Sequence, residues 1–429
     1  MFADRSPTEK TIEGELFTAF VAAGAISKAN AADPKKSSFV RCARTDKGVH
    51  AAGNVVSLKL IVEDPDLVQK INEKLSPQIR VWGIHVTSKG FSCYQLCDSR
   101  VYEYLIPSHC FLPPHPSTYL GKKLSEIAEQ RGDLDAFKAR QAEVAGFWED
   151  VDDKYVKPIL EKVPEDVRRI VQKALYLDEE ESAAAASEPH EHDTDELQDK
   201  KTTEDSGKPS EPMEHGKIEN PDSNPPPNTK QTENNNTGTT KPKKSTILET
   251  IKAIKAAYQA AKRDYRIDAT RLARIQESLD KFIGTRNFYN YTIQKRHSDP
   301  SAKRHIKSFR VEPTPILING TEWLSLKVHG QSFMMHQIRK MVCMVALVVR
   351  CGCDPEKIVQ TYGPTKVAIP KVPGLGLLLE RPVFDTYNKK VDTLGKERIQ
   401  FDKYAKEMNE FKQREIYDRI FREEEETNS

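Results

Sequence analysis

Residues 41–50, RCARTDKGVH, gather several side chains that could carry out chemistry. The carboxyl group of Asp46 lies between Arg44 and Lys47 in sequence, and His50 follows shortly after. Asp-Lys-Gly between two apolar segments is also ordinary turn chemistry, because Asp bonds its own backbone and Gly supplies a positive φ. A turn leaves the choice of Arg44, Lys47 and His50 unexplained. The stretch is therefore either a solvated turn or a site built on a carboxylate between cations.

The elements around this stretch have the pattern of an α/β unit over residues 1–115. We expect helices at TIEGELFTAFVAAG and VQKINEKL, and strands near SSFVRCAR, GNVVSLKL, RVWGIHVTS and SRVYEYLIP. Strands interleaved with two helices are typical of a ferredoxin-like half-sheet. The predicted sheet would hold Asp46 on a loop between two of its strands.

Four further parts are expected along the chain. Residues 116–177 are charged and mainly helical and form a connector. Residues 178–245 are low in complexity and nearly free of large apolar side chains, so we expect a disordered insert. Residues 246–388 have the pattern of a second α/β unit. Residues 389–429 form a helical extension that packs across a domain face.

Charge indicates the kind of partner. The net charge of +2 conceals an acidic insert, with about 17 acidic and about 5 basic residues over 178–236, so the remainder carries roughly +14. A basic folded part favours a polyanion. Seven cysteines, none in a CxxC pair, favour a reducing compartment over disulfides or zinc. The longest apolar run is too short for a membrane span, and no secretory signal is expected.

Five motifs occur in order across both predicted units: RTDKGVHA at 44–51, RVYEY at 100–104, GTRNFYNYT at 284–292, GQSFMMHQIRKMV at 330–342 and PGLGLLLE at 373–380. Together they resemble the TruA-type tRNA pseudouridine synthases, in their eukaryotic pseudouridine synthase 1 branch. The resemblance implies an α/β (α+β) fold in which two ferredoxin-like units share a central, mostly antiparallel sheet. It also implies isomerisation of uridine to pseudouridine in folded tRNA, without cofactor or metal.

The resemblance gives Asp46 the role of nucleophile, and the chemistry agrees. Breaking the N1–C1′ bond, turning the uracil and joining C5 to C1′ exchanges bonds nearly like for like, so a carboxylate nucleophile suffices. Attack at C1′ and attack at C6 both stay open. A uridine in folded RNA must first be extruded. By resemblance, Arg44 fills the space that it leaves, and Lys47 contacts phosphate.

By resemblance, Tyr102 stacks on the uracil and assists removal of the C5 proton. We expect Tyr104 to be a core aromatic on the opposite face of the strand. Arg339 would pair with Asp46 and keep it ionised, and Leu375 and Leu377 would line the uracil pocket. His50 and His336 are expected to be hydrogen-bonded structural residues, and Cys351-Gly-Cys353 is too tight for a zinc pair.

Two departures from the family pattern stand out. The family has one strand ahead of the first helix that is expected to be missing here, and Arg286 replaces a usual His. The rival interpretation is therefore a catalytically impaired RNA-binding module or RNA chaperone, and a third is an interaction protein that works through its acidic insert. For the leading one, we expect tRNA as partner, with snRNA or mRNA as further candidates, no membrane and a monomer. Its location would be the nucleus, with mitochondrion and cytoplasm as alternatives.

Overall fold

The structure, a computed structural model, describes residues 11–46, 48–186, 244–393 and 395–427; the side chains of 176–186 and 244 are not among them. The chain divides into two compact units. Unit 1 comprises Met1–Lys157 and Lys255–Ser429, and unit 2 comprises Pro158–Ile254. The domain boundaries expected at residues 115, 177, 245 and 388 stay predictions.

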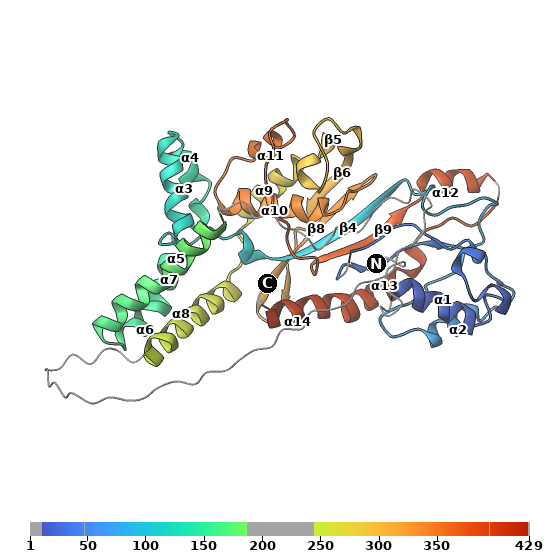
Figure 1. Ribbon diagram of the computed structural model, residues 1–429, viewed down its shortest axis with the longest axis horizontal. Coiled ribbons are helices and arrows are strands. Elements are labelled where there is room, and N and C mark those ends of the chain that lie inside the picture. The colour runs from blue at the N-terminus through green and yellow to red at the C-terminus, as the bar shows by residue number, and fades with distance from the viewer. Residues whose placement is uncertain (1–10, 47, 187–243, 394, 428–429) are drawn as a thin grey trace, which may run out of the picture. The chain divides into compact units, whose positions relative to one another are not determined.

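Unit 1 is built on a mixed sheet in which every pairing is antiparallel except that of β2 with β9 (Figure 1). The strand order is β2-β9-β4-β8-β6-β5, with β7 also on β8, while β1 and β3 pair separately. The α/β fold with a central, mostly antiparallel sheet is thereby confirmed. The strands are β1 (Val40–Arg41), β2 (His50–Ala51), β3 (Val56–Ser57), β4 (Ser99–Pro107), β5 (Gly284–Asn287), β6 (Lys303–Val311), β7 (Ile316–Ile318), β8 (Thr321–Gly330) and β9 (Leu377–Val383).

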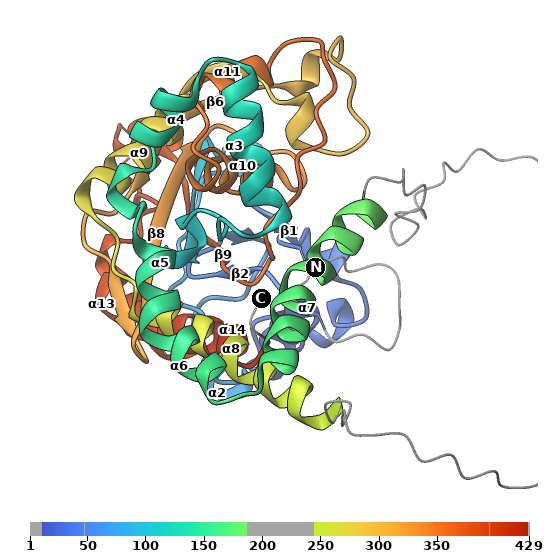
Figure 2. The same ribbon diagram turned by 90° about the vertical axis from the view of Figure 1, so that its left-hand side faces the viewer.

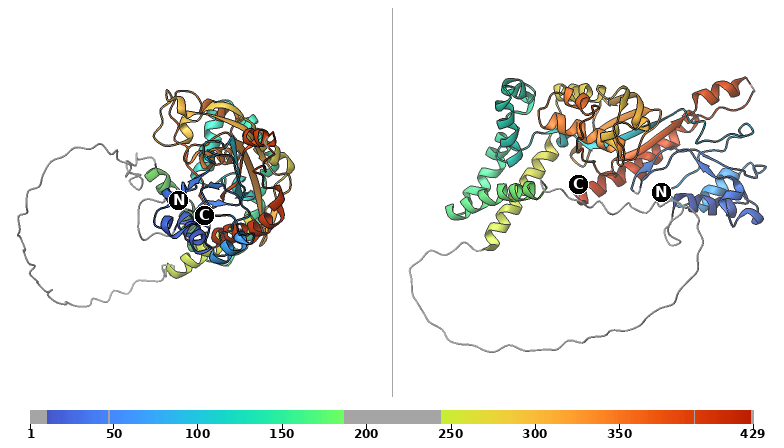
Figure 3. Two further views of the ribbon diagram at one scale, coloured as in Figure 1. Left: turned by 90° about the vertical axis from the view of Figure 1, so that its right-hand side faces the viewer. Right: turned by 45° about the horizontal axis from the view of Figure 1, so that its top comes forward.

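Helices cover both faces of this sheet. α1 and α2 pack side by side at the N-terminal end, both blue in Figure 3. α4 lies beside α9 in Figure 2, where Arg274 donates to the Ala139 carbonyl at 2.9 Å. The α-helices are α1 (Ile12–Ala22), α2 (Leu67–Lys74), α3 (Tyr119–Gln130), α4 (Leu134–Ala139), α5 (Phe147–Val151), α6 (Lys157–Glu161), α7 (Glu165–Ala186), α8 (Lys244–Asp264), α9 (Ala269–Asp280), α10 (Gln337–Arg350), α11 (Glu356–Gln360), α12 (Asp385–Asp392), α13 (Ala405–Phe411) and α14 (Asp418–Thr427).

Strand β4 is buried on both faces because helices pack on each of them. Tyr102, Tyr104 and Ile106 belong to a core under α9 and α10, and we call this side of the sheet the front face. Leu105 belongs to a second core with Phe411 of α13, on what we call the back face. Successive side chains alternate between faces, so both tyrosines lie on the front face. The expectation that Tyr104 points away from Tyr102 is therefore wrong, since residues two apart on a strand share a face.

The back face holds a buried charged network. The carboxylate of Glu103, 1% exposed, accepts from Ser325, from Tyr417 Oη at 2.8 Å and from Lys412 Nζ at 3.3 Å. Lys412 also reaches Glu380 at 2.9 Å. Lys412 lies on a π-helical turn, Lys412–Tyr417, between α13 and α14. The network therefore ties the C-terminal extension to the strand that carries Tyr102.

Of the strands predicted in the N-terminal part of unit 1, one is not formed and another is shorter than expected. RVWGIHVTS contains no strand, and GNVVSLKL contains only β3. An extended segment becomes a strand only where a second backbone pairs with it. Among the described residues, the first segment is tied by side chains instead: Asn72 bonds Val81 through its amide at 2.8 Å, and Trp82 packs edge-on against Phe411 at 5.4 Å.

Unit 2 is helical where it is described. Arg168 of α7 donates to the Leu160 carbonyl at 3.0 Å and so joins α7 to α6. α7 runs on through an Ala-rich stretch to Ala186, beyond the start of the predicted insert, because Ala is the best helix former. The rest of that insert, 187–243, lies outside the described residues. None of the helices in the described ranges combines the length and apolar character needed to span a membrane.

Candidate active site

The loop that carries Asp46 joins β1 to β2 and is closed by a tight turn. The Val49 amide donates to the Asp46 carbonyl at 3.1 Å, and Gly48 has a φ of +80°. That φ lies in the left-handed region, which glycine adopts without steric cost. Asn54 supports the loop by donating to the Ala43 carbonyl at 3.1 Å. The turn predicted from Asp-Lys-Gly is present, and it leaves Asp46 partly exposed.

Strand register connects this loop to Tyr102. Ala51 of β2 lies opposite Leu379 of β9, Leu379 lies opposite Tyr102 of β4, and Tyr102 lies opposite Val328 of β8. Neighbouring strands are about 4.8 Å apart, so Tyr102 lies about 10 Å from the end of the Asp46 loop. The row lies across the front face, where Tyr102 meets Phe333 edge-on at 5.3 Å.

The Tyr102 hydroxyl is protonated throughout the ordinary pH range. Burial is the main cause that raises the pKa of Tyr102 to about 12, and the negative charge of Asp46 contributes in the same direction. The guanidinium of Arg100 acts against both. The contribution from Asp46 means that the carboxyl group and the phenol are within electrostatic reach of each other.

Arg339 reaches the same place from α10. Its Nε donates to the Val372 carbonyl at 2.7 Å, just ahead of Gly374. A Cβ on Gly374 would lie 3.8 Å from the guanidinium carbon of Arg339 and 3.7 Å from Cγ2 of Val49. The side chains of Val49, in the Asp46 turn, and of Arg339 thus both lie near the position that a side chain at Gly374 would occupy. The structure brings the 46–49 turn and Arg339 together; the ion pair between Asp46 and Arg339 stays a prediction.

Tyr104 holds the segment to which Arg339 is bonded, a role that the sequence analysis missed. Its hydroxyl donates to the Pro373 carbonyl at 2.9 Å. Next to this bond, a Cβ on Gly376 would come within 2.4 Å of the Leu105 carbonyl, so only glycine fits there. We call residues 372–376 the strap. In the sequence, the second Tyr of RVYEY and the glycines of PGLG are the features that could have indicated this role of Tyr104.

Leu375 and Leu377 do not form one wall. Leu377 belongs to the front-face core with Tyr102, whereas Leu375 packs against the back-face core. Leu375 lies in a turn ahead of β9, in which the Leu377 amide donates to the Gly374 carbonyl at 3.1 Å. The rule that residues two apart on a strand share a face therefore does not apply to Leu375. In the strand register Leu377 lies opposite Tyr104, and Leu379 is the residue opposite Tyr102.

The remaining predicted residues have different surroundings. Arg44 is exposed, and Lys47 lies outside the described residues. His336 begins α10 with a φ of +61° and is buried. The pKa of His50 is lowered, first by burial and then by Arg419 of α14. Its Nε2 is buried with no hydrogen-bond partner among the described residues, so the expectation of a bonded structural histidine is not met at that atom.

A cationic cluster adjoins Arg339. The pKa of Lys340 is lowered, first by burial and then by the positive charges of Lys366 and Lys371. At the edge of the sheet, Arg286 of β5 lies directly opposite Arg304 of β6, and like charges in this position destabilise a sheet. Both arrangements would be relieved by an anion. We call Lys340, Lys366 and Lys371 the lysine cluster.

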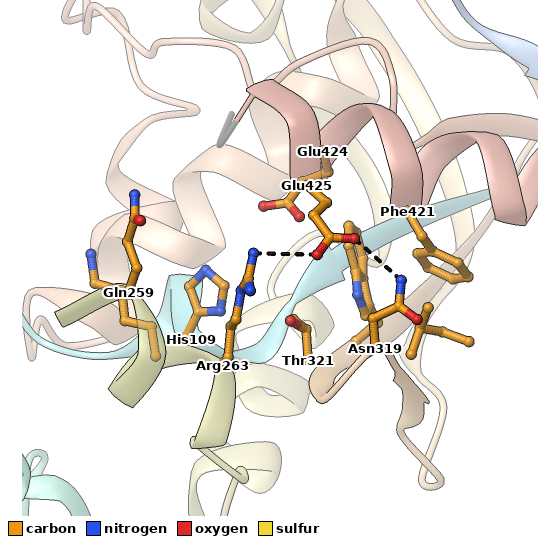
Figure 4. Close-up of a pocket in the computed structure, with 11 residues that line it drawn as sticks. His109, Gln259, Arg263, Asn319, Thr321, Phe421, Glu424 and Glu425 are labelled. Atoms are coloured by element: carbon orange, nitrogen blue, oxygen red, sulfur yellow. Dashed lines mark hydrogen bonds and ion pairs between the residues drawn. The ribbon is translucent and has the colours of Figure 1, made fainter. Parts of the chain in front are cut away.

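A cavity of about 120 Å³ lies elsewhere in unit 1, and it contains none of the predicted site residues. Figure 4 shows Arg263 and Glu425 extending toward each other within it, where they pair at 3.4 Å. Glu425 also accepts from Asn319 at 3.2 Å. Arg263, Asn319 and Glu425 of this cavity are thus engaged with one another.

Comparison with known proteins agrees with this geometry. A family model described as tRNA pseudouridine synthase matches residues 279–385, which include β5, α10 and β9. Among curated proteins, the chain is 41% identical over 420 residues to tRNA pseudouridine synthase 1 of Eremothecium gossypii, and 42% identical over 421 residues to that of Yarrowia lipolytica. Each match covers 98% of this chain, and 67% and 68% of the relatives' lengths.

A third relative has a different name. The tRNA pseudouridine(27/28) synthase of Saccharomyces cerevisiae is 31% identical over 423 residues, covering 98% of this chain and 90% of its own length. Matches of this identity and length extend through both halves of the sheet and through the Asp46 loop. The chain therefore belongs to the tRNA pseudouridine synthase family, in its eukaryotic pseudouridine synthase 1 branch.

Proposed function

We propose that this protein is an isomerase that converts uridine to pseudouridine in folded tRNA, with Asp46 as the nucleophile. The N1–C1′ bond of the nucleotide breaks, the uracil turns while it is held in the site, and C5 joins C1′. The C5 proton then leaves. The observation that carries the proposal is that Val49 of the Asp46 turn and Arg339 both lie beside the same backbone position, Gly374. Residues far apart in sequence thus lie beside one backbone position, which supports a shared site.

The neighbouring side chains suit the steps that this reaction needs. The guanidinium of Arg339, which lies beside Gly374, would orient Asp46. Tyr102 offers a ring for stacking, and its hydroxyl is neutral at physiological pH because of its raised pKa. Arg44 would occupy the space left by the extruded uridine, and Lys47 would bind phosphate. Leu377 belongs to the same front-face core as Tyr102 and would contribute apolar surface there.

The charge of the site supports RNA as the substrate. The lysine cluster concentrates positive charge: the pKa of Lys340, which follows Arg339 in sequence, is lowered first by burial and then by the charges of Lys366 and Lys371. A phosphate of the tRNA backbone would supply the missing charge and release counterions. The proposed affinity for tRNA therefore falls steeply with salt concentration.

Release of tritium from C5-tritiated tRNA tests the proposed reaction. We expect the natural chain to release tritium, and Asp46→Asn to release none while binding tRNA with nearly unchanged affinity. Asp66→Asn, which changes a carboxyl group just ahead of α2, is a matched control and should retain activity. Absence of release by the natural chain would favour the RNA-chaperone interpretation instead. Equal activity of Asp46→Asn and the natural chain would exclude the carboxylate mechanism.

We also propose a nuclear location and a monomeric state. The KPKK sequence at 241–244 supports the former, and all but its last residue lie outside the described ranges. Small nuclear RNA and mRNA are further candidate substrates. Imaging of the tagged chain with and without KPKK tests the location, and light scattering tests the monomer. Mapping pseudouridines in RNA from cells that lack the gene tests the substrates.

A further inference from the structure

Three cysteines gather between the two segments that carry the proposed catalytic residues. Cys42, Cys93 and Cys97 belong to one cluster with Phe384 and Tyr387, and we call it the thiol cluster. Cys42 precedes the Asp46 turn on the same segment, and Cys97 immediately precedes β4, the strand of Tyr102. A covalent bond within the cluster would therefore join these two segments.

The thiols of Cys42 and Cys97 are in hydrogen-bond contact with each other. Their backbones are held on both sides of that contact. The Cys42 amide donates to Val55 at 2.8 Å, and its carbonyl accepts from Arg100 at 2.9 Å. Cys97 bonds the Ser99 carbonyl through its thiol at 3.2 Å. The two sulfur atoms are thus kept adjacent by the surrounding structure.

Cys93 differs from this pair although it belongs to the same cluster. Its thiol donates to the Val40 carbonyl at 3.2 Å, and burial raises its pKa. It is fully buried, as is Cys42, whereas Cys97 is partly exposed. A small solute can therefore reach Cys97 before the other two thiols.

Protonation also distinguishes the two partners. The hydrogen bond from Cys42 is the largest cause that lowers the pKa of Cys97 to about 6, and the charge of Arg100 adds to it. The same hydrogen bond, together with burial, raises the pKa of Cys42. A thiolate is the reactive form of cysteine toward oxidants. Cys97 is thus suited to react first and Cys42 to resolve the product.

We propose that Cys97 and Cys42 form an oxidation site at which hydrogen peroxide closes a disulfide between the Asp46 segment and β4. The Cys97 thiolate attacks one peroxide oxygen, the O–O bond breaks, and hydroxide leaves with the electron pair to become water. The Cys97 sulfenic acid that results is attacked by the Cys42 sulfur, and a second water leaves. In sum, two thiols are oxidised, one peroxide is reduced, and two waters form.

The disulfide affects catalysis only if the proposed function is correct. It would fix the loop of Arg44 and Asp46 to the base of β4, although a uridine must be extruded into this region. Displacement of a reacting group by about 1 Å can cost on the order of 100-fold in rate. We therefore expect oxidation to lower pseudouridine formation by about tenfold or more, and dithiothreitol to restore it.

The test uses the full chain treated with hydrogen peroxide, then digested without reduction. Mass spectrometry should find one linked peptide pair, containing Cys42 and Cys97, lighter than the two free peptides by the mass of two hydrogen atoms. Cys97→Ser and Cys42→Ala should lose the link. Cys93→Ser is the matched control and should keep it. Thermal unfolding of each variant checks that it is folded.

Two results would overturn the inference. One is a linked pair that contains Cys93, and the other is peroxide-treated natural chain in which Cys42 and Cys97 stay free. Both are read from the natural chain, so they do not depend on a variant that folds. Failure of the proposed function is seen separately, as absence of tritium release by the reduced chain. A disulfide that forms without changing activity would refute the catalytic consequence.

Discussion

Replacing Lys412 by Met tests whether the buried back-face network stabilises the strand of Tyr102. Lys412 is 8% exposed and lies between two carboxylates, Glu103 at 3.3 Å and Glu380 at 2.9 Å. Met has nearly the same length without the charge. The substitution leaves two buried carboxylates facing each other, with no cation between them.

The expected cost follows from this burial. Removing one partner of a buried ion pair costs about 3–5 kcal/mol, because the remaining charge is left uncompensated. For a unit of this size such a loss corresponds to a fall in the unfolding temperature of roughly 10 °C. The hydrogen bonds to Glu103 from Ser325 and Tyr417 do not depend on Lys412, so they limit the loss to this range.

The loss should depend on pH. In the natural chain burial raises the pKa of Glu103, but Lys412 and the hydrogen bonds outweigh it, so the pKa is lowered overall. The pKa of Glu380 is raised, first by burial. Without Lys412 the pKa of both carboxyl groups rises in the folded state. A group whose pKa is higher in the folded state than in the unfolded state stabilises the fold at pH values below its unfolded pKa, and this stabilisation is lost as pH rises. The gap between variant and natural chain should therefore be largest near pH 7 and shrink towards about pH 4.5.

Thermal and urea unfolding at both pH values measure this difference. Lys403→Met is the matched control, since Lys403 pairs with Glu397 at the surface and should change stability by less than about 1 kcal/mol. Adding Glu103→Gln to Lys412→Met should recover part of the loss. The reasoning is refuted if Lys412→Met loses less than about 1 kcal/mol near pH 7, or if the gap is the same at both pH values.

Three other predictions concern the site. Tyr102→Phe keeps the ring and loses the hydroxyl, so tritium release should fall about 10²-fold with tRNA affinity unchanged. Because the pKa of Tyr102 is raised to about 12, the natural chain should lose no activity through deprotonation of this group below about pH 11. Tyr104→Phe removes the hydrogen bond to the Pro373 carbonyl and should lower kcat about tenfold at unchanged KM. Urea unfolding should show a stability loss of about 1 kcal/mol. An effect on stability alone would contradict the role of Tyr104 in holding Arg339. Lys366→Ala should reduce the slope of log affinity against log salt by about one, as measured by titration of tRNA, and an unchanged slope would exclude phosphate at the lysine cluster.

Patterns among neighbouring residues were sufficient to predict individual elements of the fold. The segment SRVYEYLIP ends at Pro107, and it was predicted with the bounds that β4 has in the structure. The five motifs identified the family, and the 46–49 turn followed from Asp-Lys-Gly. These features depend on neighbours in sequence, which the sequence displays directly.

Features that depend on distant partners could not be predicted in this way. The segment RVWGIHVTS has a strand pattern, yet strand formation requires a pairing backbone. Leu375 falls on the back face because of a turn that is held by Tyr104 and Leu105 of another strand. The thiol contact between Cys42 and Cys97 likewise joins residues distant in sequence, and neither spacing nor composition relates the two. Lys47 and residues 187–243 lie outside the described ranges, so the predictions made for them stay as they were.

The parallel pairing of β2 with β9 has a consequence for how the protein matures. His50 pairs with Leu378 of β9, so the first strand of the site has to wait until β9 has left the ribosome. Translation proceeds at about 5–20 residues per second, and the waiting segment is exposed for tens of seconds. A prematurely terminated polypeptide that lacks β9 cannot place Asp46 at all, so incomplete synthesis would yield inert protein rather than an enzyme of altered specificity.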